Sequence, residues 1–123
     1  RPTTTMRAGF GTALRLAELC RRNRITPVLC TVPPASGRYT TTTTAADMSR
    51  EACRRAINGM IRAAAAADTA MKLLDTDLVV ADNSATPSTI ATAYNGGDGI
   101  HFSDAGNAAI ATAAQTLIAA LIS

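Results

Sequence analysis

The feature that most constrains the fold is an unbroken apolar run, Ile25-Thr26-Pro27-Val28-Leu29-Cys30-Thr31-Val32, which ends at Pro33-Pro34. An alternating pattern would predict a strand with one wet face, whereas a continuous run is typical of a strand in a parallel sheet that is covered on both faces. Pro27 stands at the start of the run, where a missing N–H is tolerated. We therefore predict a buried strand that has neighbours on both sides.

Helical periodicity appears on both sides of this strand. Residues 5 to 23 place Ala13, Leu14, Ala17 and Cys20 on one face of a predicted helix. Residues 47 to 68 predict a second helix, whose apolar stripe we expect to face the core: Met48, Ala52, Ile57, Met60, Ile61 and Ala64. Between the strand and the second helix, residues 35 to 46 read as a loop that includes the run Thr40 to Thr44.

The second half of the chain repeats the alternation. Residues 71 to 75 predict a short strand that ends in Asp75, and Leu78 to Val80 either extends it or begins the next loop. Residues 82 to 97 read as mostly irregular, with a short helix over 88 to 94. Asp104 is a suitable N-cap for a last, uncharged helix over 105 to 121, of which we expect more than one face to be covered.

The order helix, strand, helix, strand, helix predicts an α/β fold with a parallel sheet and right-handed crossovers. Two strands do not make such a sheet stable by themselves. We therefore expect residues 1 to 123 to be the second half of a larger α/β domain. We also expect the open edge of the strand from Pro27 to Val32 to be covered by another chain or by a symmetry mate.

Composition predicts a globular domain and argues against nucleic acid as a partner. Hydrophobic residues make up 47% of the chain, but aromatic residues only 3%, so the core is expected to be built from small aliphatic side chains. The net charge is a mild +3. Arg21, Arg22 and Arg24 cluster at a predicted helix end without interleaved aromatic residues, so we predict a solvated face and no nucleic-acid partner.

The cysteines and the apolar C-terminal run suggest neither a metal site nor a membrane span. Cys20, Cys30 and Cys53 are widely spaced in apolar contexts, so buried free thiols are expected, and a disulfide between two of them stays open. The longest apolar run, residues 108 to 122, is shorter than the roughly 18 residues of a membrane span, and Thr112, Gln115 and Thr116 interrupt it. The chain starts at Arg1 rather than Met, so we expect a fragment or a processed product.

The candidate site lies in the segment Asp98-Gly99-Ile100-His101, which holds the single histidine of the chain. Histidine is the side chain whose ordinary pKa suits proton transfer near neutral pH, and an aspartate beside its ring fixes the tautomer. By spacing alone the pair predicts either a catalytic dyad or a surface and helix-capping pair. One histidine with scattered carboxylates is a poor ligand set, so no metal is expected.

The segment from Asp98 to Ala111, Asp-Gly-Ile-His-Phe-Ser-Asp-Ala-Gly-Asn-Ala-Ala-Ile-Ala, resembles the last conserved block of the SGNH (GDSL-type) hydrolases. That block reads Asp-Gly-x-His-Pro, a polar turn, Gly and an Ala-rich helix, and Phe102 replaces the usual proline here. The strand from Thr26 to Val32 is similar to the family's fourth strand and Leu73-Leu74-Asp75 to its fifth. The resemblance implies a flavodoxin-like three-layer α/β/α fold.

By this resemblance His101 is the general base and Asp98 its orienting acid in a serine esterase that needs no cofactor. The family's Gly-Asp-Ser nucleophile block and its oxyanion-hole Gly and Asn blocks have no counterpart in this chain. None of the serines follows Gly-Asp: Ser36, Ser49, Ser84, Ser88, Ser103 and Ser123. We therefore expect the nucleophile in a missing N-terminal segment or a partner chain, and this chain alone to be inactive.

The resemblance implies hydrolysis of acyl esters, with O-acetylated carbohydrate or lipid ester as the substrate class. Loops 35 to 46 and 82 to 97 would shape the substrate site. A degenerate relative is the second explanation for the missing blocks. The alternative function is a non-catalytic carbohydrate-binding or assembly module of the same fold.

Overall fold

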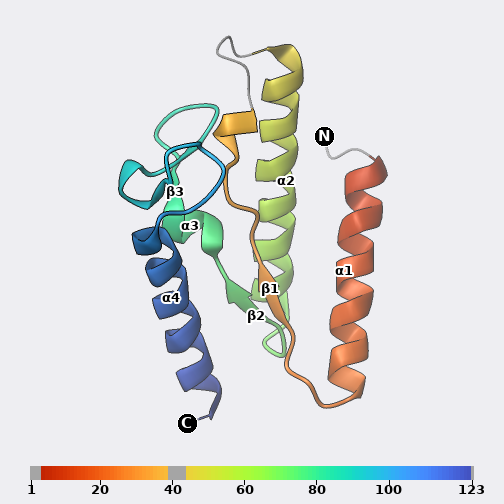
Figure 1. Ribbon diagram of the computed structural model, residues 1–123. Coiled ribbons are helices and arrows are strands. Elements are labelled where there is room, and N and C mark those ends of the chain that lie inside the picture. Colours follow the sequence, from red (N-terminus) through yellow and green to blue (C-terminus); the bar gives the residue numbers. More distant parts are fainter. Residues whose placement is uncertain (1–3, 39–43, 123) are drawn as a thin grey trace.

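The computed structural model describes residues 4 to 38 and 44 to 122 (Figure 1). Its elements follow the predicted alternation of helices and strands. In chain order they are α1 (Thr4–Arg22), β1 (Val28–Cys30), η1 (Ser36–Arg38), α2 (Ala45–Ala67), β2 (Lys72–Leu74), α3 (Thr76–Val80), β3 (Ala81–Asp82), β4 (Thr89–Ile90), η2 (Thr92–Tyr94) and α4 (Asp104–Ile122).

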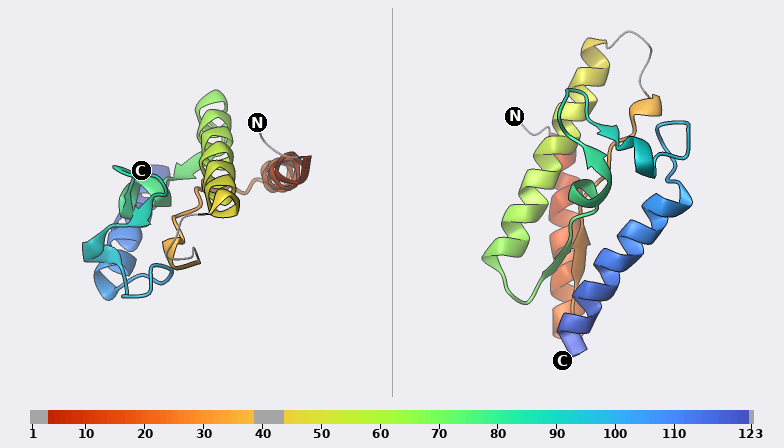
Figure 2. Two further views of the ribbon diagram at one scale, coloured as in Figure 1. Left: turned by 90° about the horizontal axis from the view of Figure 1, so that it is seen from above. Right: turned by 90° about the vertical axis from the view of Figure 1, so that its left-hand side faces the viewer.

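β1 and β2 form a parallel pair in the register Val28–Lys72 to Cys30–Leu74, with α2 as the connecting helix. α2 packs on both strands, and α4 packs on β2 and α3. Figure 2 shows α2 and α4 on opposite sides of the strands, so the layers are helix, sheet and helix. The predicted α/β class with a parallel sheet is confirmed. β1 is shorter than the apolar run because β2 supplies only three partner residues.

α2 begins two residues earlier than predicted because of a capping box at its first turn. The Thr44 hydroxyl accepts a hydrogen bond from the Asp47 amide at 3.1 Å, and the Asp47 carboxylate accepts one from the Thr44 amide at 3.4 Å. Of the predicted loop run Thr40 to Thr44, residues 40 to 43 lie outside the described residues.

Two local predictions after β2 are wrong. Leu78 to Val80 belongs to a helix, α3, because the Asp75 carboxylate caps it by accepting from the Leu78 amide at 3.2 Å. Residues 82 to 97 are mostly irregular, as predicted, but the predicted helix over 88 to 94 is wrong: Thr89–Ile90 is strand β4, paired antiparallel with β3, and only Thr92–Tyr94 forms a single helical turn. Ile90, in strand β4, is buried, with 2% of its surface exposed.

α4 begins at Asp104, which is its first helical residue and not its N-cap. The cap is Ser103, whose hydroxyl accepts from the Gly106 amide at 3.2 Å. Within α4 only Gly106 is buried, so the expected cover over more than one face is absent from the described part of the chain.

α4 is also long and apolar enough to cross a membrane by length and composition alone. The helix has 19 residues, and an 18-residue window within it has a mean hydropathy of 1.5, of which 6% is buried. The prediction that this segment is too short to span a membrane is therefore wrong. That it does not span one stays a prediction.

The core is small, and the inner face of α2 is polar. The buried hydrophobic residues are Ala17, Ile61, Met71, Val80 and Ile90. The apolar stripe predicted to face the core from α2 contributes only Ile61 to this group. The face that α2 buries carries instead Asp47, Glu51, Arg54 and Asn58.

All three cysteines are free, as the default prediction has it, but they are not buried. Cys30 is exposed, and Cys20 and Cys53 are partly buried. Cys30 is exposed because the described residues cover only part of β1, the strand predicted to be buried on both sides.

Candidate functional site

The predicted site residues Asp98 and His101 lie in the loop that joins η2 to α4. An antiparallel bridge between Asn95 and Phe102 closes the base of this loop. The Asn95 side-chain oxygen accepts hydrogen bonds from the amides of Gly97 at 2.9 Å and Gly99 at 3.0 Å. One asparagine therefore fixes the path of the backbone that leads into Asp98.

Asp98 makes three short contacts with the residues that follow it. One carboxylate oxygen accepts from the amides of Ile100 and His101, both at 2.8 Å. The other oxygen lies 2.6 Å from Nδ1 of His101. The structure thus brings the two predicted residues together, with the histidine side chain 80% exposed and the aspartate 50% exposed.

The hydrogen bonds to Asp98 settle which ring nitrogen carries the proton. Bonds from the His101 backbone and ring and from the Ile100 amide hold the pKa of the Asp98 carboxyl well below its ordinary range. An ionised carboxylate only accepts hydrogen bonds, so Nδ1 of His101 is the donor. In the neutral imidazole Nε2 is then the unprotonated nitrogen, available as a base.

A second loop supports the Asp98–His101 loop from the carboxyl end of β1. The Gly37 amide donates to the Gly99 carbonyl at 3.0 Å. A Cβ on Gly37 would lie 1.8 Å from the Asp98 carbonyl oxygen, and Gly99 has a φ of +70°. Gly37 must be glycine because its Cα lies against the backbone of Asp98. Gly99 must be glycine because its backbone is left-handed.

Two side chains of α2 hold the start of this supporting loop. The Asn58 amide group accepts from the Val32 amide at 2.8 Å and donates to the Val32 carbonyl at 2.9 Å. Arg54 also donates to that carbonyl, at 2.9 Å. Asn58 thereby takes the place of a neighbouring strand at the point where β1 stops pairing.

Sequence reasoning missed these two positioning residues, although a signal was present. Asp47, Glu51, Arg54 and Asn58 recur at spacings of four, three and four residues, which places them on one helix face. The apolar residues of α2 alone do not reveal this polar stripe.

The polar stripe belongs to a buried ion network. Arg54 bonds both oxygens of Glu51 at 2.8 Å and Asp77 at 2.6 Å. Burial raises the pKa of the Glu51 carboxyl, but hydrogen bonds from Arg54, Arg55 and Ser88 outweigh burial and hold this pKa at about 2. Each buried charge therefore has a partner of opposite sign.

No serine hydroxyl among the described residues hydrogen-bonds to the His101 ring. Ser103 is engaged with the Ala93 carbonyl and the Gly106 amide, and Ser88 with Asn83 and Arg55. Ser36 comes near the loop, since a Cβ on Gly99 would lie 2.9 Å from its hydroxyl, but it does not bond to the histidine. The geometry supplies a base and its orienting acid without a nucleophile.

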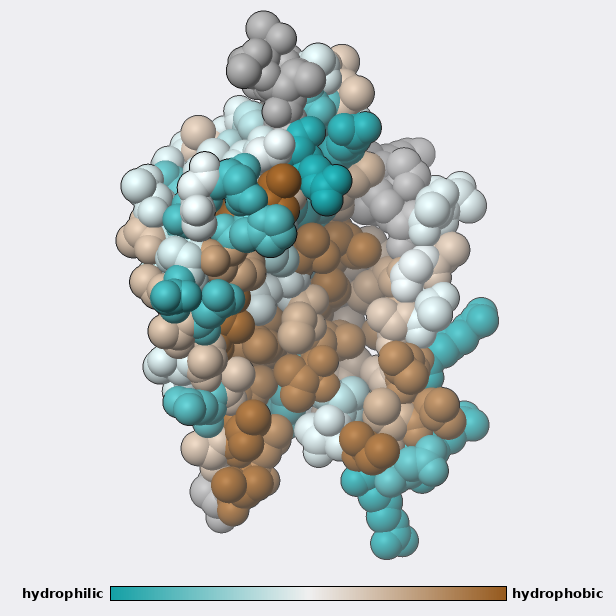
Figure 3. All heavy atoms as spheres, viewed as in Figure 1, coloured by the Kyte–Doolittle hydropathy of each residue, from teal (hydrophilic) through white to brown (hydrophobic). Residues whose placement is uncertain are grey.

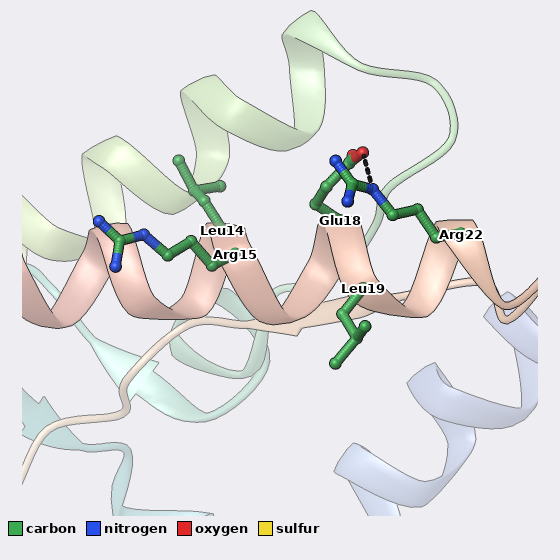
Figure 4. Close-up of a pocket in the computed structure, with 5 residues that line it drawn as sticks. All are labelled: Leu14, Arg15, Glu18, Leu19 and Arg22. Atoms are coloured by element: carbon green, nitrogen blue, oxygen red, sulfur yellow. Dashed lines mark hydrogen bonds and ion pairs between the residues drawn. The ribbon is translucent and has the colours of Figure 1, made fainter.

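A hollow on α1 offers no alternative site. It is lined by Leu14, Arg15, Glu18, Leu19 and Arg22, all from one helix. Figure 4 shows these side chains pointing in different directions, with Arg22 paired to Glu18. Across residues 4 to 38 and 44 to 122, no group of three or more His, Cys, Asp and Glu side chains could hold a metal ion.

The arrangement has the SGNH (GDSL-type) hydrolase fold, as two solved structures show. Each is similar in fold to almost the whole of this chain. One is a predicted acylhydrolase from Bacteroides fragilis, with a TM-score of 0.74, 21% identity, 96% of this chain covered and 53% of the other. The second is a GDSL-like lipase from Bacteroides thetaiotaomicron, with a TM-score of 0.69, 22% identity, and coverage of 94% and 53%.

The chain therefore spans about half the length of these solved structures. The predicted relationship to this fold is confirmed, and its extent agrees with the expected second half of a domain. No family model matches the chain, and no curated protein matches it in sequence.

Proposed function

We propose that this chain supplies the general base and the orienting acid of a serine ester hydrolase. The observation that carries the proposal is the 2.6 Å contact between Asp98 and Nδ1 of an exposed His101 ring. The fold shared with an acylhydrolase and a GDSL-like lipase supports the same chemistry. The serine would come from polypeptide outside residues 1 to 123, either a preceding segment or a partner chain.

The chemistry follows from the protonation state of the pair. Nε2 of His101 takes the proton of the serine hydroxyl as the oxygen attacks the ester carbonyl, and Asp98 stabilises the imidazolium that forms. His101 then protonates the leaving alcohol. Water hydrolyses the acyl-enzyme with His101 again as the base. This sequence of steps requires no metal or organic cofactor.

We propose acyl esters of carbohydrate, or lipid esters, as the substrate class. The supporting loop that contains Ser36 and Gly37 lies against the Asp98–His101 loop and would form one wall of the substrate site. The ribbon and turn over residues 81 to 94 lead into the other side of the same loop.

The test uses the chain extended by the residues that precede Arg1 in its gene, with p-nitrophenyl acetate as substrate. We expect hydrolysis, and we expect His101→Ala to abolish it. Asp104→Asn, an exposed carboxylate three residues after His101, is the matched control and should leave the rate unchanged. Hydrolysis that survives His101→Ala would rule out the triad. An extended protein without hydrolysis would favour the non-catalytic module instead.

A further inference from the structure

The segment that carries Asp98 is rich in glycine. Gly96, Gly97 and Gly99 surround the aspartate. Gly97 has a φ of +108° and Gly99 a φ of +70°, which other residues rarely adopt. Glycine loses more backbone freedom on folding than any other residue. This segment therefore needs specific bonds if it is to hold the Asp98 carboxylate in one place.

Little of this order can come from burial of apolar side chains. Gly96, Gly97 and Asp98 are exposed. Figure 3 shows mainly hydrophilic and weakly polar side chains around the start of α4, whereas apolar atoms gather lower, between α4 and α1. The order of the segment must therefore come from hydrogen bonds to its backbone.

The Asn95 side chain supplies two of these hydrogen bonds with a single atom. Its Oδ1 accepts from the amides of Gly97 at 2.9 Å and Gly99 at 3.0 Å, the residues on either side of Asp98. Because two N–H groups donate to this one atom, it is the oxygen of the side-chain amide and not the nitrogen. One partly buried side chain thus holds the backbone before and after Asp98.

The backbone of Asn95 is itself fixed to the residues around His101. Asn95 forms an antiparallel bridge with Phe102. The Gly96 amide donates to the His101 carbonyl at 2.8 Å. Asn95 and His101 therefore belong to one rigid frame, and the asparagine side chain holds Asp98 relative to that frame.

The two peptide units that follow Asp98 are each held at both ends. In the first unit, the Gly99 amide bonds Asn95, and the Asp98 carbonyl oxygen lies where a Cβ on Gly37 would be only 1.8 Å away. In the second, the Ile100 amide bonds the Asp98 carboxylate at 2.8 Å, and the Gly99 carbonyl accepts from the Gly37 amide at 3.0 Å. Without Asn95, the first unit keeps only a packing contact and can rotate.

We propose that Asn95 is a positioning residue for ester hydrolysis and acts through Asp98 on the tautomer of His101. Rotation of the Asp98 backbone would lengthen the 2.6 Å contact between the carboxylate and Nδ1. The ring would then adopt the tautomer that free histidine prefers, with the proton on Nε2, which leaves no base facing the serine. The kinetic part of this proposal rests on the proposed function, whereas the effect on the ring does not.

The tautomer of His101 is measurable without any need for activity. The probe is the pair of ring ¹⁵N chemical shifts, read by long-range ¹H–¹⁵N NMR in alkaline buffer, where an imidazole is neutral. The protein is the chain extended by the residues that precede Arg1, and His101→Ala identifies the signals. We expect Asn95→Ala to lower the ratio of the Nδ1–H to the Nε2–H form at least about fivefold, because the bond that sets the tautomer is weakened.

Two variants serve as matched controls. Asn95→Asp keeps an oxygen that accepts from Gly97 and Gly99, so it should retain the tautomer of the unsubstituted protein. Asn107→Ala removes an exposed asparagine from the first turns of α4 and should change nothing.

The kinetic test separates positioning from binding. Because Asn95 acts on the base and not on the substrate, Asn95→Ala should lower kcat for p-nitrophenyl acetate by about 10²-fold, the cost of misplacing a catalytic group, with KM within a few-fold. Active-site titration with a p-nitrophenyl phosphate triester counts the competent sites, so unfolded protein does not enter kcat. Asn95→Asp should restore kcat to within a few-fold of the unsubstituted protein.

Hydrogen exchange in the unsubstituted protein tests the same contact without a substitution. Gly97 and Asp98 are both exposed, but the Gly97 amide bonds Asn95, whereas the Asp98 amide has no acceptor among the described residues. We expect the Gly97 amide to exchange at least about tenfold more slowly than the Asp98 amide.

Three results would overturn the proposal. The first is an unchanged tautomer ratio in Asn95→Ala, whatever happens to kcat. The second is an equal change in Asn95→Asp or in Asn107→Ala, since the Asn95 oxygen would then not be the cause. The third is exchange of the Gly97 amide as fast as that of the Asp98 amide.

Positioning and catalysis fail separately in this design. A tautomer shift in Asn95→Ala of a protein that hydrolyses no ester would support the positioning of the ring and refute the proposed function. Hydrolysis that depends on His101, with an Asn95→Ala variant that matches the unsubstituted protein, would do the reverse.

Discussion

At the scale of single residues, the candidate site depends on a short segment that organises itself. Asp98 bonds the backbone and the ring of His101 with separate oxygens, so one side chain sets both the turn and the tautomer. This explains how the pair could be found from spacing alone. The bonds connect residues no more than three positions apart, and they need little help from the rest of the fold.

Asp98→Asn tests the tautomer argument. The amide would present an N–H to Nδ1 and would favour the wrong ring tautomer. In the extended protein we expect kcat for p-nitrophenyl acetate to fall by about 10⁴-fold, as for the same change in a serine-protease triad. A kcat within a few-fold of the unsubstituted protein would show that Asp98 does not orient the base.

Gly37→Ala tests the close approach of the two loops. A methyl group would lie 1.8 Å from the Asp98 carbonyl oxygen, so the loops must separate. We expect a loss of about 3 kcal/mol in the free energy of unfolding, the upper end for overpacking. Gly59→Ala is the control, because nothing lies within 4 Å of its added Cβ in α2 and helix propensity predicts a gain of about 0.5–1 kcal/mol. Urea denaturation of the two variants measures both.

At the scale of elements, polar side chains decide how α2 packs. Glu51, Arg54 and Asn58 are buried on the face that meets β1 and α3, where a hydrophobic stripe was predicted. The polar face is accommodated because every charge finds a partner: Arg54 bridges Glu51 and Asp77, while Asn58 bonds the backbone of Val32. Removing one partner would leave an uncompensated buried charge.

The pH dependence of stability follows from Glu51. Its pKa falls from an ordinary 4.5 to about 2 in the folded chain, and its side chain is 1% exposed. A lowered folded pKa gives stability that is fully present above pH 4.5 and is lost as the pH falls toward 2. The contribution is about 3 kcal/mol at neutral pH.

Glu51→Gln isolates this contribution. The other carboxylates titrate in both proteins, so the difference in free energy of unfolding between them should shrink between pH 5 and pH 2. Urea denaturation at several pH values, followed by circular dichroism, measures the difference. A difference that stays constant with pH would contradict the lowered pKa.

At the scale of the whole molecule, the described chain is an incomplete layer structure. Five hydrophobic side chains are buried, whereas ten large ones are exposed, so most of the apolar surface needed for a stable domain is uncovered. The same incompleteness accounts for the exposure of β1 and α4, which the sequence pattern marked as buried.

We expect residues 1 to 123 alone to bind the dye ANS and to unfold over a broad range of urea concentration. The extended protein should bind little ANS and unfold sharply. The double substitution Leu16→Glu and Leu19→Glu should lower ANS binding by the short chain, because it replaces two exposed apolar side chains of α1 with charged ones. A short chain that unfolds in a sharp transition without binding ANS would show that its own core suffices.

The sequence by itself determined the order of helices and strands, the parallel class of sheet and the Asp98–His101 pair, because these depend on periodicity and on contacts between near neighbours. Only the tertiary structure decided the α3 helix, the β3–β4 ribbon, the polar face of α2 and the support that Gly37 gives to Gly99. Each of these depends on a contact or a burial between segments far apart in the chain, such as Asn58 with Val32. The pattern of residues in one segment does not identify the distant residue that bonds to it or buries it.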